Sequence, residues 1–254
     1  GGSIFMQIDK WKSHLNERKY IINKFKNKKI FILGSNFGPY TDEEFKNEYE
    51  ALFKKCTDVC FRDKYSYDLF KHIKNVRLAP DIVFQLKNDD YNKRDTRKCV
   101  GISIINLEER NNLKSFVKPY EIKIKDIIEK YIENGYEIKL FSFCKSEGDD
   151  KAIDRVLNIT NKTYLNKINS FEYNGNIDSY IKEFKSCEII VGTRFHSVIL
   201  SQLFGQGLYP LVYSEKTVNI LKYLELDKFY SDISDIEHLD VNEIINIASS
   251  NKIN

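Results

Sequence analysis

The chain alternates between short apolar segments and amphipathic segments along nearly its whole length, and this pattern constrains the fold more than any other feature of the sequence. Short runs rich in Ile, Val and Phe are typical of strands that are buried on both faces. Segments with apolar residues three or four positions apart are typical of helices that cover a sheet. Because strands that alternate strictly with helices are joined by right-handed crossovers, the pattern predicts an α/β fold with parallel, doubly wound sheets.

The predicted elements follow from this periodicity. The predicted strands are Lys29–Gly34, Asp58–Arg62, Val76–Leu78, Cys99–Ile105, Glu137–Phe143, Lys162–Leu165, Cys187–Val191 and Leu208–Val212. The predicted helices are Lys10–Phe25, Thr41–Cys56, Lys64–Ile73, Val117–Asn134, Asp149–Ile159, Ile177–Lys185, Phe195–Phe204, Glu215–Leu224 and Val241–Ser249.

One polar segment, Lys87–Lys98, interrupts the alternation, which then starts again. Its sequence, KNDDYNKRDTRK, is almost free of apolar residues and predicts a linker. We therefore predict two Rossmann-like parallel-sheet domains that face a cleft, an N-terminal domain over residues 1–86 and a C-terminal domain over residues 99–239. The last helix, within residues 240–254, could serve either domain.

The first residues are unusual for the start of a chain. Met6 is the single Met and follows Gly-Gly-Ser-Ile-Phe, so Gly1 is not a translation start. We expect either a cloning remnant or a piece of a longer chain. A basic segment followed by an apolar stretch and a small-residue cleavage site is absent from this start, so we expect no signal peptide.

Composition excludes several classes of function. Lys and Arg number 40 against 37 Asp and Glu, and a net charge of +3 argues against a dedicated nucleic-acid binder, which would carry a strongly basic stripe. No apolar run approaches the roughly 20 residues of a membrane-spanning helix. The five Cys are widely spread, with no CxxC pair and no Cys/His set at zinc spacing, and predict buried thiols in a reducing compartment.

The most informative turn lies between a predicted strand and a predicted helix, in Glu188–Ser197. In open α/β sheets ligands bind beyond the carboxyl ends of strands, where this turn is expected. Gly192 permits a tight turn, the helix start favours an anion, and Arg194 can add a guanidinium fork. His196 can exchange a proton near neutral pH, and Ser197 can donate a hydrogen bond. The alternative is a His that packs on its own helix beside an Arg in a surface ion pair.

Four other strand-to-helix turns carry polar residues. The turn Gly34-Ser-Asn-Phe-Gly-Pro-Tyr-Thr41 offers Ser35 and Asn36 to a polar or anionic ligand, although it is neither GxGxxG nor a P-loop. Arg62, Asp81 and Lys216 follow the next strands in the same way, as groups that could point into a cleft or reach a phosphate. Each also has an ordinary structural reading as a turn, a helix cap or a stabilised loop.

Taken in order, these turns resemble the polysaccharide pyruvyl transferase family over about residues 1–225. The matching segments are Gly34-Ser-Asn-Phe-Gly-Pro, Phe61-Arg-Asp-Lys-Tyr-Ser, Ala79-Pro-Asp, Val191-Gly-Thr-Arg-Phe-His-Ser and Tyr213-Ser-Glu-Lys. The resemblance implies a two-domain fold like that of GT-B glycosyltransferases. It also implies transfer of the enolpyruvyl group of phosphoenolpyruvate to two hydroxyls of a sugar, which makes a pyruvate ketal on a bacterial surface polysaccharide or its lipid-linked precursor.

The resemblance also assigns roles to individual residues. The Arg-x-His element of the family falls on Arg194 and His196 and is associated with phosphoenolpyruvate and catalysis, and further family positions fall on Arg62, Asp81 and Lys216. His196 is the expected general acid and base, with Asp81 as the second candidate. Arg194, with Lys216 or Arg62, is the expected anion clamp. No metal and no cofactor are expected, and phosphoenolpyruvate is the donor.

One departure from the family concerns the start of the chain. Gly1-Gly2-Ser3 is similar to a Gly-Gly-rich turn that the family places after its first strands, so the first βα units are expected to be missing.

The family further implies a cytoplasmic enzyme of exopolysaccharide and cell-envelope synthesis that meets the inner membrane face through its glycan or lipid-linked acceptor. Two alternatives remain open. One is a GT-B glycosyltransferase or sugar-nucleotide epimerase that binds a nucleotide diphosphate at the same helix start. The other is a non-catalytic family member that acts within a glycan-assembly complex.

Overall fold

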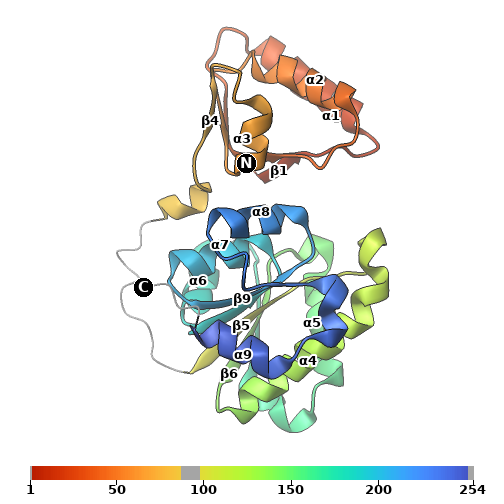
Figure 1. The fold of residues 1–254 in the computed structure, drawn as a ribbon, viewed down its shortest axis with the longest axis vertical. Helices are drawn as coiled ribbons and strands as arrows, with labels where there is room; N and C mark the ends of the chain where they lie inside the picture. Colours follow the sequence, from red (N-terminus) through yellow and green to blue (C-terminus); the bar gives the residue numbers. More distant parts are fainter. Residues whose placement is uncertain (1, 87–97, 251–254) are drawn as a thin grey trace. The chain divides into compact units, whose positions relative to one another are not determined.

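The computed structural model describes residues 2–86 and 98–250 and divides the chain into two compact units, Gly1–Leu86 and Lys87–Asn254 (Figure 1). Each unit contains one parallel sheet with its helices and its own hydrophobic core. The predicted linker lies outside the described residues except for Lys98.

The first unit is a four-stranded parallel sheet in the order β1-β2-β3-β4. Its elements are β1 (Gly2–Phe5), α1 (Trp11–Lys24), β2 (Phe31–Phe37), α2 (Glu43–Phe53), β3 (Asp58–Phe61), α3 (Lys64–Phe70), β4 (Val76–Leu78) and the 3₁₀ helix η1 (Ile82–Gln85). The core is aromatic: Phe37 packs edge-to-face against Phe53 and Phe70, at centroid distances of 6.1 and 4.8 Å. Such edge contacts suit the charge distribution of aromatic rings.

The prediction of a turn at Gly1-Gly2-Ser3 is wrong, because Gly2–Phe5 forms strand β1. This strand pairs in parallel with β2, with Gly2 opposite Ser35 and Phe5 opposite Phe37. Phe5 is buried in the aromatic core, and its burial holds this short edge strand in place.

The second unit is a six-stranded parallel sheet in the order β10-β9-β8-β5-β6-β7. Its strands are β5 (Cys99–Ile104), β6 (Glu137–Ser142), β7 (Ile168–Glu172), β8 (Ile189–Gly192), β9 (Gly207–Val212) and β10 (Ser231–Asp232). Its α-helices are α4 (Val117–Glu133), α5 (Asp149–Ile159), α6 (Ile177–Lys185), α7 (Phe195–Leu203), α8 (Glu215–Tyr223) and α9 (Val241–Ser250). The two parallel sheets confirm the predicted α/β fold class.

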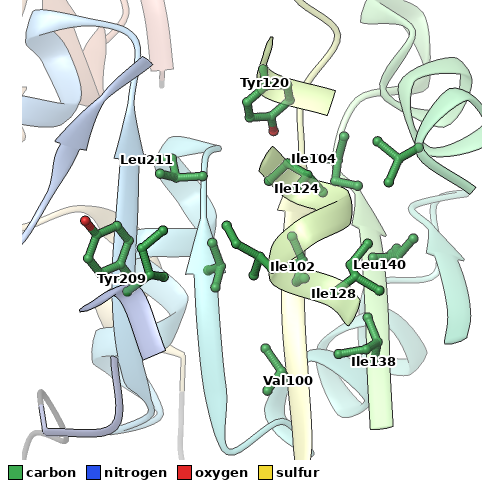
Figure 2. Close-up of a cluster of buried hydrophobic side chains, with 14 of the residues drawn as sticks. Val100, Ile102, Ile104, Tyr120, Ile124, Ile128, Ile138, Leu140, Tyr209 and Leu211 are labelled. Atoms are coloured by element: carbon green, nitrogen blue, oxygen red, sulfur yellow. The ribbon is translucent and has the colours of Figure 1, made fainter. Parts of the chain in front are cut away.

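The core of the second unit lies between the sheet and α4 (Figure 2). Along β5, the buried side chains of Val100, Ile102 and Ile104 point to this face because side chains alternate along a strand. Ile124 and Ile128 meet them from α4, four residues apart and therefore on one side of the helix. All six residues of β5 are buried, as a central parallel strand requires.

The chain order of the second sheet reverses beside β5. From β5 the chain moves outward through β6 and β7, and it then returns to the other side of β5 and moves outward through β8, β9 and β10. The carboxyl ends of β5 and β8 are therefore a topological switch point, with Ser103 opposite Gly192. Open α/β sheets bind ligands at such a point because the crossovers diverge there.

Two strands differ from the sequence-based prediction. Lys162–Leu165 is not a strand but part of a 3₁₀ helix, Lys162–Lys167, and β7 begins only at Ile168. Asn161 starts this helix by accepting a hydrogen bond from the Thr163 N–H at 3.1 Å. Strand β10 was not predicted, since two residues are too few for a periodic pattern.

The last helix, α9, packs on the second sheet. A Cβ atom at Gly207 in β9 would collide with the carbonyl oxygen of Ala248 in α9, so this close approach requires glycine.

Candidate functional site

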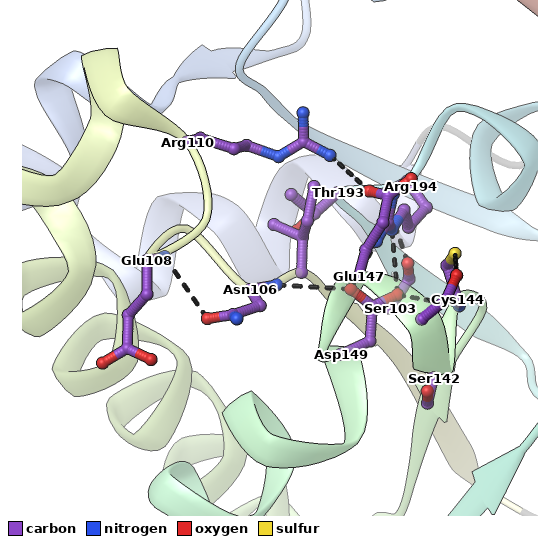
Figure 3. A network of polar contacts seen from close by, with 12 residues as sticks. Ser103, Asn106, Glu108, Arg110, Ser142, Cys144, Glu147, Asp149, Thr193 and Arg194 are labelled. Carbon is purple, nitrogen blue, oxygen red and sulfur yellow. Dashed lines mark hydrogen bonds and ion pairs between the residues drawn. The ribbon is translucent and has the colours of Figure 1, made fainter.

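Buried polar residues gather at the switch point of the second sheet (Figure 3). Ser103 lies near the end of β5, Thr193 and Arg194 follow β8, and Asp149 opens α5. Each of these residues is at most 9% exposed, which is unusual for polar and charged groups in one place. The cluster is therefore the candidate functional site at the position where open α/β sheets bind ligands.

The backbone of the Arg194 turn is shaped by Ser103 and by two of the predicted site residues, Gly192 and Ser197. The Arg194 N–H donates to Ser103 Oγ at 3.2 Å, and the Arg194 carbonyl accepts from Ser197 Oγ at 2.5 Å. A Cβ atom at Gly192 would lie 2.9 Å from Ser197 Oγ, which explains the glycine. Gly192 and Ser197, both predicted to bind substrate, are buried and form the turn itself.

The Arg194 guanidinium forms a bidentate pair with a buried carboxylate. Nε donates to Asp149 Oδ2 at 2.9 Å and Nη2 donates to Asp149 Oδ1 at 2.5 Å. Burial disfavours the charge, but the hydrogen bond to Asp149, the Asp149 charge and the hydrogen bond to Glu147 outweigh it and raise the pKa of Arg194. The predicted anion clamp therefore already holds a protein carboxylate along one edge.

The remaining edge of Arg194 faces Glu147, which a second arginine shares. Arg194 Nη1 donates to Glu147 Oε2 at 2.7 Å, and Arg110 Nη2 donates to the same oxygen at 2.6 Å. Burial of the carboxyl group opposes its ionisation, but the hydrogen bond from Arg194 and the charges of Arg194 and Arg110 prevail and lower the pKa of Glu147. Arg110 also lies 4.7 Å from the centre of the Tyr213 ring, which follows β9.

His196 is exposed on the first turn of α7. The exposed ring is open to a ligand, although it also contacts its own helix, as the structural alternative expected. Its ring contacts the neighbouring Phe195 ring edge-on at a centroid distance of 5.3 Å. Lys216 is half-buried, and its Nζ lies 4.3 Å from the centre of the same Phe195 ring. The structure thus brings three predicted residues, Arg194, His196 and Lys216, to one helix start.

The first unit has a polar cluster of its own, beyond the carboxyl ends of β2, β3 and β4. Arg62 Nη1 donates to Asp81 Oδ2 at 2.6 Å, and Arg62 Nη2 donates to Asn36 Oδ1 at 2.9 Å. Asp81 also accepts from the Val83 N–H at 3.0 Å. The Ser35 hydroxyl is fully buried and has no hydrogen-bond partner among the described residues.

Besides Ser103, the sequence did not indicate three further residues of this site: Arg110, Glu147 and Asp149. Asp149 was placed at a helix start, but nothing marked it as the partner of an arginine 45 positions away. The sequence feature that could have identified all three is their position, because each follows the carboxyl end of β5 or β6.

Within residues 2–86 and 98–250, no group of three or more His, Cys, Asp and Glu side chains is arranged to hold a metal ion. No helix in these ranges is long and apolar enough to cross a membrane.

The two parallel sheets define a protein with a GT-B-like α/β fold, and solved structures agree. The chain is similar to MnaA of S. aureus in complex with UDP, at 9% identity and a TM-score of 0.60, over 97% of this chain and 78% of that chain. It is also similar to ADP-heptose LPS heptosyltransferase II of E. coli, at 11% identity and a TM-score of 0.52, over 93% of this chain and 81% of that chain. At such low identity these likenesses show the fold alone.

The chain belongs to the polysaccharide pyruvyl transferase family, whose model matches residues 1–215. A curated relative is the amylovoran biosynthesis protein AmsJ of Erwinia amylovora, which is 23% identical over 230 residues. The match covers 82% of this chain and 55% of the relative, so the chain spans about half the length of that protein. The expected membership of this family is confirmed over residues 1–215.

Proposed function

We propose that this protein transfers the enolpyruvyl group of phosphoenolpyruvate to two hydroxyls of a sugar in a bacterial surface polysaccharide or its lipid-linked precursor. Family membership supports the reaction class, and the relative named for amylovoran biosynthesis supports a polysaccharide acceptor. The observation that carries the proposal is the position of His196, exposed at the start of α7 beside the arginine cluster of the switch point.

The proposed reaction needs a proton donor and an anion site. Protonation of C3 of phosphoenolpyruvate leaves positive charge at C2, which one sugar hydroxyl attacks with loss of its proton. The C2–O bond to phosphate breaks, and a second hydroxyl adds to C2, so the products are the ketal and inorganic phosphate. His196 would give and accept these protons. Arg194 and Lys216 would hold the growing charge of the phosphate.

In the same proposal, the polar cluster around Arg62 in the first unit also binds substrate. Asp81 and Asn36 hold the Arg62 guanidinium from two sides, so Asp81 serves first as a positioning residue. The buried Ser35 hydroxyl has no hydrogen-bond partner among the described residues and is therefore the group proposed to bind substrate here.

The test is incubation of the protein with phosphoenolpyruvate and candidate lipid-linked glycans, followed by mass spectrometry. We expect the mass increment of a pyruvate ketal on the acceptor and an equal amount of inorganic phosphate. Acceptor turnover without phosphate release, or consumption of a nucleotide sugar instead, would contradict the proposal.

The fold favours one second candidate, a nucleotide-sugar enzyme, because the similar structures include a UDP complex and a heptosyltransferase. Thermal shift separates the two candidates. Stabilisation by phosphoenolpyruvate and not by UDP or nucleotide sugars supports pyruvyl transfer, and the reverse supports the alternative.

A further inference from the structure

Two arginines converge on one exposed carboxylate oxygen at the switch point. Glu147 Oε2 accepts from Arg110 at 2.6 Å and from Arg194 at 2.7 Å (Figure 3). The two guanidinium groups come from different elements: Arg110 follows β5, and Arg194 follows β8. The side chain of Glu147 is 47% exposed, so water reaches the place where the two positive charges meet.

The two carboxylates on Arg194 differ in how firmly they are held. Asp149 is fully buried, and its carboxylate also accepts from the backbone N–H groups of Asn106 at 3.3 Å and Cys144 at 3.0 Å. Glu147 lies in a single 3₁₀ turn, Lys145–Glu147, which ends at Gly148 in the left-handed region at a φ of 77°. The Glu147 side chain can therefore leave without disturbing the core, whereas Asp149 cannot.

The charges of this group favour exchange with an external anion. Two guanidinium groups face two carboxylates, so the cluster is neutral when Glu147 is in place. When the Glu147 side chain turns away, the cluster carries one net positive charge. The guanidinium groups of Arg110 and Arg194 then face the vacated position, and guanidinium geometry suits a carboxylate or a phosphate. Asp149 keeps Arg194 in position throughout.

We propose that the position of the Glu147 carboxylate is a binding site for an anionic group of the substrate. Arg110 is a second anion-binding residue of this site, beside Arg194, and Glu147 is a built-in competitor that occupies the site until the anion arrives. The choice of phosphoenolpyruvate as the ligand rests on the proposed function, but the anion site itself does not.

The test is calorimetric titration of the full chain with inorganic phosphate as the probe, repeated with phosphoenolpyruvate. We expect Glu147→Gln to bind phosphate about 2–10-fold more tightly, because it removes a competing half-exposed ion pair. We expect Arg110→Gln to bind it about 10-fold more weakly or worse, because a charge-assisted hydrogen bond is lost.

Each variant has a matched control in the same unit. Glu172→Gln removes an equal charge from a carboxylate whose side chain is 36% exposed and which pairs with Lys145 beside the site. Arg155→Gln removes an equal charge from an arginine that is 29% exposed, against 31% for Arg110. Both controls should leave phosphate affinity within about twofold of that of the unchanged protein. An equal gain in Glu172→Gln, an unchanged affinity in Glu147→Gln, or phosphate binding that no variant alters would overturn the proposal.

The same titrations separate this inference from the proposed function. If phosphate responds as expected while phosphoenolpyruvate binds no more tightly than phosphate and is not turned over, the anion site stands and pyruvyl transfer fails. If pyruvyl transfer is observed but phosphate affinity does not depend on Arg110 or Glu147, the anion site fails and the proposed function stands.

Discussion

Arg194 combines a structural task with its proposed role in substrate binding. Its bidentate contact with Asp149 neutralises a carboxylate that has no exposed surface. Such a pair adds little stability compared with apolar residues, but removal of one partner leaves a buried charge unpaired. A loss of activity in an Arg194 variant therefore does not by itself prove contact with substrate.

This gives the first prediction. Arg194→Ala and Asp149→Ala should each destabilise the protein by about 3–5 kcal/mol in urea unfolding, because each leaves its partner charged and buried. The double variant should lose less than the sum of the two, since no charge then remains unpaired. Additive losses would show that the two side chains do not depend on each other.

The second prediction concerns His196. Loss of a general acid costs about 10²–10⁴ in rate, so His196→Gln should reduce ketal formation by that factor. Because the side chain is exposed, the thermal midpoint should stay unchanged. His238→Gln, also at an exposed site in the second unit, is the control and should keep full turnover. Near-normal turnover in His196→Gln would show that another residue donates and accepts the protons.

The third prediction concerns acidic pH. The pKa of Glu147 is lowered in the folded protein from an ordinary value of 4.5, so its ion pairs stabilise the native state fully above that value. This contribution should be lost as the pH falls below about 4.5 and through the folded pKa. At neutral pH it should be at most about 1 kcal/mol, because the pair is half exposed. A stability difference between the protein and Glu147→Gln that grows on acidification would contradict this sign.

At the scale of elements, the periodic pattern was a good guide wherever a helix was clearly amphipathic. Asp149–Ile159 and Ile177–Lys185 have the predicted bounds, since polar residues flank each apolar stripe. The prediction failed at β7, an edge strand whose sequence Ile-Asn-Ser-Phe-Glu contains only two apolar residues, three positions apart. A search for continuous apolar runs misses such a strand.

The site was only half predictable for a related reason. Arg194 and His196 stand in one short motif at a strand end, which a sequence displays. Glu147 and Asp149, which pair with Arg194, and Arg110, which pairs with Glu147, come from other crossovers. Only the strand order brings these residues together. No local pattern carries that information.

The turn after β8 gives the fourth prediction. Gly192→Ala should destabilise the protein by about 1–3 kcal/mol, because its new methyl group would lie 2.9 Å from Ser197 Oγ. In the background of Ser197→Ala, which removes that oxygen, the same substitution should cost clearly less. Urea unfolding of the four proteins measures this coupling, and an equal cost in both backgrounds would show that the contact is not the cause.

At the scale of the whole molecule, the two units have separate hydrophobic cores. Arg110, Glu147, Asp149, Arg194 and His196 all belong to the second unit. The residues named for the proposed anion site therefore all come from one sheet and its crossovers.

The fifth prediction follows from this division. A chain of residues 98–254, which has its own core, should fold cooperatively and bind phosphate with the affinity of the full chain. Circular dichroism and calorimetry check the two properties. A folded fragment that has lost phosphate binding would show that the first unit contributes to the anion site.

The central claim is that phosphoenolpyruvate binds at the switch point of the second sheet, where His196 can protonate it. A crystal structure of the complex tests this claim most directly. We predict phosphoenolpyruvate held by Arg110 and Arg194, with the Glu147 side chain turned away and the His196 ring within hydrogen-bonding reach of the ligand. Phosphoenolpyruvate bound elsewhere, with Glu147 still between the two arginines, would contradict the account.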